Sequence, residues 1–162
     1  TTSLWMVYSL GKVTKTDAFE TYAPHFDRRH NFNIVASRIF GEDKSWTFDM
    51  RWNYGSGFPF TETQGYYENI NFEDGINTDI TQSNGDLGIY YADYNRGQMP
   101  DYHRLDVSIK KKITFSKNSI IETTLSISNL YDRANIFYYD QLTDSRINQL
   151  PFMPSIGANW QF

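Results

Sequence analysis

The three histidines are the first residues whose chemistry could support catalysis or metal binding. His25, His30 and His103 lie in expected loops or at expected strand starts, and no two have metal-ligand spacing on one strand face. No Ser/His/Asp arrangement and no glycine-rich phosphate loop accompanies them. The chain has no cysteine, which excludes disulfides and thiolate metal sites. We therefore expect no enzyme and no cofactor, and we expect the histidines to make polar contacts.

Oxygen-bearing side chains gather between residues 74 and 86. Ca²⁺ binds about six to eight hard oxygen ligands of this kind. The candidates are Asp74, Asn77, Asp79, Asn84 and Asp86. Their spacing fits no EF-hand loop, and solvated loop residues are the commoner explanation. Calcium is thus the one candidate metal, weighed against simple solvation.

Tyrosines are concentrated in the same part of the chain, beside an arginine. A tyrosine offers a flat apolar face and a hydroxyl group, which suits contact with a ligand, a glycan or a partner protein. The alternative is packing of the loop on itself. The set is Tyr66, Tyr67, Tyr90, Tyr91 and Tyr94, with Arg96.

The elements that must position these residues show a period of two, as side chains do along a β-strand. From 45 to 54 one face is wholly apolar or aromatic: Trp46, Phe48, Met50, Trp52 and Tyr54. The other face is wholly polar: Thr47, Asp49, Arg51 and Asn53. Residues 103–115 and 152–162 repeat the pattern. Weaker runs cover 4–13, 30–40 and 120–131, so six strands are expected.

The strands and their connections have the proportions of a membrane barrel. Each strand is about ten residues or a little longer, the length of a tilted strand that crosses a bilayer. Tight polar turns at 41–44 and 116–119 alternate with long loops at about 11–29, 58–101 and 132–150. Short turns on the periplasmic side and long loops on the extracellular side are typical of outer-membrane barrels. We expect an all-β fold, an antiparallel transmembrane β-barrel.

The alternation divides the charged residues between two faces. The residues expected in the lumen are Asp49, Arg51, Asn53, Arg104, Asp106, Lys110 and Glu122. Lys111 falls on the lipid face, where a lysine at mid-bilayer costs about 2–4 kcal/mol. Either Lys111 lies near the inner interface and extends its amine to water, or a bulge shifts the register there.

The composition suits a barrel better than a soluble domain. Aromatic residues make up 17% of the chain, yet the mean hydropathy is -0.59, as when aromatics face lipid while lumen and loops stay polar. The net charge of -4 gives no basic surface for nucleic acid. No run approaches the about 18 apolar residues of a spanning helix, and the first residues do not resemble a signal peptide. We expect an exported protein that was processed or is part of a longer one.

Five stretches, in order along the chain, resemble motifs of the TonB-dependent receptors of Bacteroidota. Residues 22–33 resemble the strand start YDRRHDLN, and residues 54–61 resemble the strand exit Y-G/A-T-G-x-P-x-T. Residues 99–106 match MPxYHRLD almost letter for letter, and residues 128–133 match NLYDR. Residues 150–162 resemble the closing strand of the family. The motifs are spread over nearly the whole chain.

The resemblance implies the outer membrane, and a barrel of about 22 strands that imports a siderophore, vitamin, peptide or glycan. Residues 1–162 would form its last six or so strands. The plug domain, the other strands and the contact with TonB–ExbB–ExbD would come from the remainder of the same receptor. The lumen charges would pair with the plug or be solvated, and the tyrosines would meet a surface lipoprotein or lipopolysaccharide.

The end of the chain carries one more implication of the resemblance. Trp160 and Phe162 resemble the C-terminal signal that is read by the outer-membrane insertion machinery. The same two residues also suit the inner aromatic girdle of a barrel, and both roles can hold together.

Two other functions stay open from the residues alone. One is a structural or adhesive barrel subunit that a partner chain completes. The other is a soluble sugar-binding β-sandwich, in which the aromatic stripe would form the core. The sandwich would be soluble without detergent, whereas either barrel would need lipid or detergent.

Overall fold

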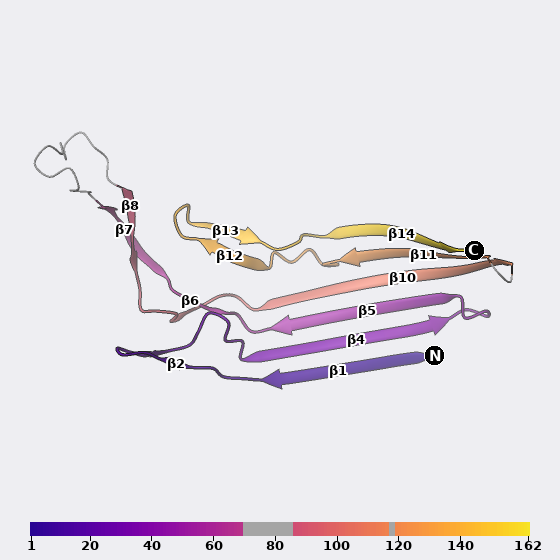
Figure 1. The fold of residues 1–162 in the computed structure, drawn as a ribbon, viewed down its shortest axis with the longest axis horizontal. Coiled ribbons are helices and arrows are strands. Elements are labelled where there is room, and N and C mark those ends of the chain that lie inside the picture. Colours follow the sequence, from indigo (N-terminus) through magenta and orange to yellow (C-terminus); the bar gives the residue numbers. More distant parts are fainter. Residues whose placement is uncertain (70–85, 117–118) are drawn as a thin grey trace, which may run out of the picture.

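The fold is an antiparallel sheet whose six strands follow one another in chain order. The computed structural model describes residues 1–69, 86–116 and 119–162. The sheet order is β1-β4-β5-β10-β11-β14, and every neighbouring pair is antiparallel (Figure 1). The strands are β1 (Thr2–Leu10), β4 (His30–Phe40), β5 (Trp46–Gly55), β10 (Tyr102–Ser116), β11 (Ser119–Ser128) and β14 (Met153–Gln161). All six strands expected from the alternation are present.

Two of the strands end earlier than the sequence pattern suggests. β1 stops at Leu10 rather than at residue 13, because the amide of Val13 donates to Asp27 Oδ1 (2.9 Å) and leaves the ladder. β11 stops at Ser128 rather than at residue 131, because Asn129 has a φ of 53°. That left-handed backbone cannot continue a strand.

The register puts the apolar side chains of β5 on one face of the sheet with alternate apolar residues of β4 and β10, whereas Trp5, Val7 and Val35 lie on the other face. Trp52 lies opposite Ile34 on β4 and opposite Leu105 on β10. On the other face, Arg51 lies opposite Asp106. The register is regular at Lys111, and the only irregularity of the β10–β11 pair lies between Thr114 and Ser116. The bulge suggested for Lys111 is therefore absent.

The long loops contain short ribbons that the sequence pattern did not predict. These are β2 (Lys15–Thr16) with β3 (Thr21–Tyr22), β6 (Pro59–Phe60) with β9 (Gly97–Gln98), β7 (Thr63–Asn69) with β8 (Asp86–Tyr91), and β12 (Ile136–Asp140) with β13 (Ser145–Asn148). The described parts of the three long loops extend from one end of the sheet, and the turn at 41–44, the end of β10, the start of β11 and both ends of the chain lie at the other (Figure 1). We call these the loop end and the turn end.

The sheet is a single layer with two open edges. Among the described residues no hydrophobic core is buried; the buried polar residues are Ser56, Asn95, Asn129 and Asn135. β1 and β14 are the edge strands, so the described residues form no closed barrel. In the described ranges no helix has the length and apolar character needed to cross a membrane.

Candidate functional site

The residues expected in a lumen share one face of the sheet, which we call the polar face. Asp49 lies at its centre, where it accepts a hydrogen bond from Ser37 Oγ (2.7 Å) and pairs with Lys110 Nζ (3.6 Å). Asn53 donates to Asn33 across the β4–β5 pair. Arg51 lies opposite Asp106, and Glu122 lies opposite Lys112. The strands thus bring the whole predicted set onto one charged surface.

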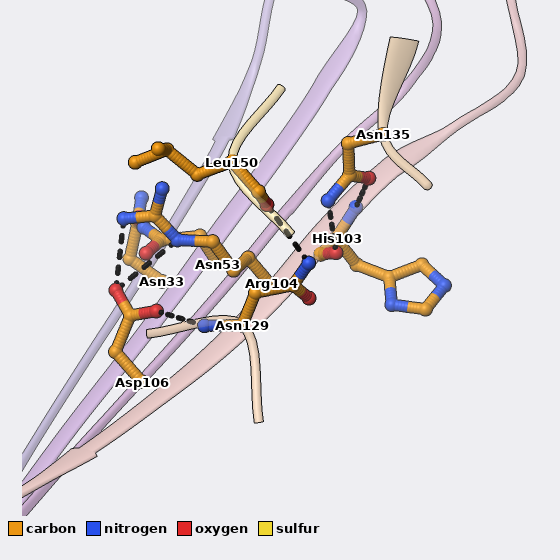
Figure 2. A network of polar contacts seen from close by, with 8 residues as sticks. All are labelled: Asn33, Asn53, His103, Arg104, Asp106, Asn129, Asn135 and Leu150. Carbon is orange, nitrogen blue, oxygen red and sulfur yellow. Dashed lines mark hydrogen bonds and ion pairs between the residues drawn. The ribbon is translucent and has the colours of Figure 1, made fainter. Parts of the chain in front are cut away.

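Asn129 joins the polar face to the loop that follows β11 (Figure 2). Arg104 donates to Asp106 through Nη2 (2.8 Å), and Asp106 Oδ1 accepts the backbone amide of Asn129 (3.0 Å). The fully buried Asn129 side chain donates to the carbonyls of Arg133 (2.9 Å) and Leu150 (3.0 Å). Its Oδ1 accepts the Arg133 amide (3.0 Å). These bonds hold both ends of the third long loop at the polar face.

Asn135 fixes the same loop to the start of β10. It donates to the His103 carbonyl (2.9 Å) and accepts the His103 amide (3.1 Å), as a neighbouring strand would do (Figure 2). Buried amide side chains therefore take the structural role that apolar residues have in an ordinary core. Asn95, Asn129 and Asn135 were not predicted as functional residues; the signal for Asn129 is its place in residues 128–133, which resemble a family motif.

A second junction at the loop end joins the exit of β5 to the approach to β10. Asp101 accepts hydrogen bonds from the Tyr54 hydroxyl (2.7 Å) and from the Gly57 amide (3.0 Å), and both bonds hold the pKa of Asp101 below its ordinary value. A Cβ on Gly57 would overlap the Met99 carbonyl oxygen, so only glycine allows this approach. Arg28 lies over the Phe58 ring (4.2 Å to its centroid), and burial lowers the pKa of its guanidinium.

Residues of the three long loops line an open cavity of about 690 Å³. Among the described residues, the lining of this loop cavity contains no Asp, Glu, Lys or Arg. Side-chain bonds connect the loops that form it, among them Asn95 Nδ2 to the Ala23 carbonyl (2.9 Å) and Gln141 Nε2 to the Thr61 carbonyl (2.7 Å). Its aromatic wall comprises Phe26, Phe58, Phe60, Tyr91, Tyr94, Phe137 and Tyr138. Its volume is within the range of about 300–1,000 Å³ that is usual for small-molecule sites.

The predicted tyrosine cluster is divided by the structure. Tyr91 and Tyr94 line the loop cavity, and Tyr94 meets the edge of the Tyr22 ring at 4.7 Å. The Tyr66 hydroxyl donates to the Gln141 carbonyl, so this tyrosine joins two loops. Tyr67 covers Gly88, whereas Tyr90 is largely exposed. Arg96 pairs with Asp93 (3.4 Å) on the surface rather than with a tyrosine.

The candidate metal ligands lie for the most part outside the described residues. This is so for Asp74, Asn77, Asp79 and Asn84, whereas Asp86 is the exposed first residue of β8. Within residues 1–69, 86–116 and 119–162, no three His, Asp or Glu side chains are arranged to hold a metal ion. His30 instead bonds the Tyr8 hydroxyl (2.9 Å), and His103 bonds the Tyr131 hydroxyl (2.7 Å).

The opposite face of the sheet, the apolar face, has no second layer over it in the described residues and has aromatic rings at both ends; its edge strands are exposed and its central side chains are half-buried. The loop-end belt comprises Tyr8, Phe32, Trp52, Tyr54 and Tyr131, with ring contacts such as Phe32 to Trp52 (5.9 Å). The turn-end belt comprises Phe40, Trp46, Trp160 and Phe162, again with contacting rings. Between the belts the face is mainly aliphatic: Leu4, Met6, Ile34, Ala36, Met50, Leu105, Val107, Ile109, Leu125, Ile127 and Ile156.

The spacing of the belts follows from β5. Tyr54 and Trp46 are eight residues apart on this strand, which is about 26 Å along the strand at about 3.3 Å per residue. A tilt of about 40° would reduce this to about 20 Å across a membrane, close to the about 25 Å of an outer-membrane barrel.

Lys111 and Trp160 both lie in or beside the turn-end belt. Lys111 Nζ lies 4.5 Å from the Trp46 ring centroid and donates to Ser45 Oγ (3.0 Å), at the tight turn. Lys111 therefore extends along the ring toward the tight turn, and its position near a membrane interface stays a prediction. Trp160 donates to Ser119 Oγ (3.1 Å) and contacts the 95% exposed ring of Phe162.

Comparison with known proteins adds no relative to this description: no family model, curated protein or solved structure matches the chain.

Proposed function

We propose that this chain forms part of the wall of an outer-membrane transporter of the TonB-dependent type, which imports a scarce nutrient. The observation that carries the proposal is the exposed apolar face with an aromatic belt at each end. In a soluble protein a second layer would cover such a face. The described residues form a single-layer sheet without that cover. In a bilayer the aliphatic band meets the hydrocarbon and the two belts meet the interfaces.

The two open edges favour a larger barrel. β1 and β14 each present an unpaired row of backbone groups, which is untenable in lipid. Six strands are fewer than the about eight of the smallest membrane barrels. Further strands must therefore pair with both edges, and the motif resemblance favours about 22 in total.

In such a transporter, the polar face and the loop cavity would have different roles. The polar face, with Asp49, Arg51 and Arg104, would line the lumen and contact a plug domain of the same receptor, which TonB–ExbB–ExbD would act on. The loop cavity would lie at the outer mouth, where its aromatic wall and amide groups suit an uncharged part of the nutrient. The outer-membrane insertion machinery, lipopolysaccharide and a surface lipoprotein are the further partners we propose.

A barrel subunit completed by a partner chain is the alternative, because it would have the same two faces and edges. The soluble sandwich is disfavoured, since the aromatic stripe has no opposing sheet among the described residues.

The intact mass of the polypeptide from the outer-membrane fraction tests the proposal. A mass several times the 19.0 kDa of residues 1–162, with a plug domain in the additional sequence, is the expected result. A mass near 19.0 kDa would favour the subunit that a partner completes. Recovery from the soluble fraction without detergent would contradict both barrel functions.

A further inference from the structure

Two cations interrupt the apolar face, and both lie toward its turn end. Arg38 lies opposite Phe48, and Lys111 lies opposite Trp46, so their side chains share the face of these rings. All carboxylates of the six sheet strands, Asp49, Asp106 and Glu122, lie on the polar face instead. On the apolar face of these six strands, the charged residues are therefore Arg38 and Lys111, without any carboxylate.

The two cations are close enough to act on one group. They are two strands and two residues apart, which places their Cα atoms about 12 Å from one another. Both side chains are long and flexible, and Trp46 lies between their strands. In the described part of the chain neither cation forms an ion pair with a carboxylate.

A hollow at the turn end adjoins Lys111. Its volume is about 450 Å³, and its lining includes Lys44, Ser45, Lys111 and Lys112, with Asp43 as its one acid. Lys44 has a φ of 53° in the tight turn, where its amide donates to the Gly41 carbonyl (3.1 Å). Lys111 reaches the hollow from the apolar face and Lys112 lies on the polar face, so the hollow places three lysines and one acid where the sheet ends.

We propose that Arg38 and Lys111 bind the phosphate of an anionic phospholipid headgroup at the turn-end membrane interface. The inference rests on the proposed function, because it requires that the apolar face meets lipid. The acyl chains would lie on the aliphatic band, and Trp46 would lie at the level of the headgroup, as aromatic belts do. A guanidinium and an ammonium then meet the complementary charge, and Ser45 and Lys44 border the remainder of the headgroup.

The test is competition between two lipids for the full-length protein that contains this chain. Detergent-purified protein is mixed with equal amounts of phosphatidylglycerol and phosphatidylethanolamine, and the retained lipids are counted by native mass spectrometry. The wild type should prefer phosphatidylglycerol by about tenfold or more, from two cations at a membrane surface. Arg38→Gln with Lys111→Gln should bring the ratio close to one.

Two control variants test whether the lipid preference depends on these two positions or only on the net charge of the protein. Arg51→Gln with Lys110→Gln removes the same charge from the polar face and should keep the wild-type ratio. Arg38→Lys with Lys111→Arg keeps both charges and should also keep it. A wild-type ratio near one, or equal loss in the polar-face pair, would overturn the lipid site. The lipid site would also be overturned if the protein bound inorganic phosphate but retained no phospholipid.

The lipid site and the proposed function fail in different ways. A protein that is found in the outer membrane but binds the two lipids equally would lack the lipid site and keep the proposed function. A protein that is absent from the outer membrane and retains neither lipid would contradict both.

Discussion

The Asn129 side chain holds the loop after β11 in place by hydrogen bonds, where an ordinary domain would use apolar packing. It has no exposed surface, and its two amide hydrogens and its oxygen all bond the backbone of residues 133 and 150. Its φ of 53° is a conformation that asparagine tolerates and most other residues do not. The loop after β11 therefore depends on one residue for both its turn and its anchor.

Substitution of Asn129 should separate these two roles. Asn129→Gly keeps the left-handed backbone but loses the side-chain bonds, so we expect a loss of about 2–3 kcal/mol in unfolding free energy. Asn129→Ala should lose about 1 kcal/mol more, because alanine resists the positive φ. Urea unfolding in lipid vesicles measures both values. Equal stability of wild type and Asn129→Gly would contradict the anchoring role.

Met50 lies in the middle of the aliphatic band, between Ala36 and Val107. Met50→Arg should lower the unfolding free energy in lipid vesicles by about 2–4 kcal/mol, because its charge would lie in mid-bilayer. Asn53→Arg on the polar face should change it little. Equal losses at the two positions would show that the faces have been misassigned.

The six sheet strands could be predicted from the sequence, whereas the arrangement of the loops could not. A strand with one apolar and one polar face shows its period in the residue types, as 45–54 does. The ribbons β6–β9 and β12–β13 have no such period, because their pairing depends on single contacts such as Gly57 with Met99. The predicted tyrosine set located part of the cavity wall, but its phenylalanines come from loops whose contacts no spacing reveals.

The junction of β5 and β10 depends on the small size of Gly57. Gly57→Ala should force the chain away from the Met99 carbonyl and cost about 1–3 kcal/mol or more. Gly65→Ala is the matched control, because a Cβ there meets nothing within 4 Å. Proteolysis of the 58–69 and 86–101 segments should become faster in the first variant alone. Equal proteolysis of both variants would refute the close approach.

The same junction should weaken in acid. The pKa of Asp101 is lowered by its bonds to Tyr54 and Gly57, so its contribution is complete above its unfolded pKa of about 3.9 and is lost as the pH falls through the lower folded value. Pepsin cleavage near residue 101, relative to a reference peptide, should therefore accelerate below about pH 4. In Asp101→Asn this acid-dependent step should disappear; its persistence would assign the step to another group.

The sheet has a single layer, two unlike faces and two unpaired edges. These features are typical of one segment of a larger structure rather than of a self-contained globule. Stability must come from what covers the apolar face and from what pairs with β1 and β14. In the function we propose, a bilayer and further strands would supply both. The proposed function requires that the apolar face is in contact with lipid.

Site-directed spin labelling along β5 tests that claim most directly. Single labelled cysteines replace residues 48 to 53 one at a time in the membrane-embedded full-length protein, and collisions with oxygen and with a water-soluble nickel chelate are measured. We predict high oxygen and low nickel accessibility at Phe48, Met50 and Trp52, and lower oxygen accessibility at Asp49, Arg51 and Asn53. Nickel access at Met50, or no period of two along the strand, would contradict the account.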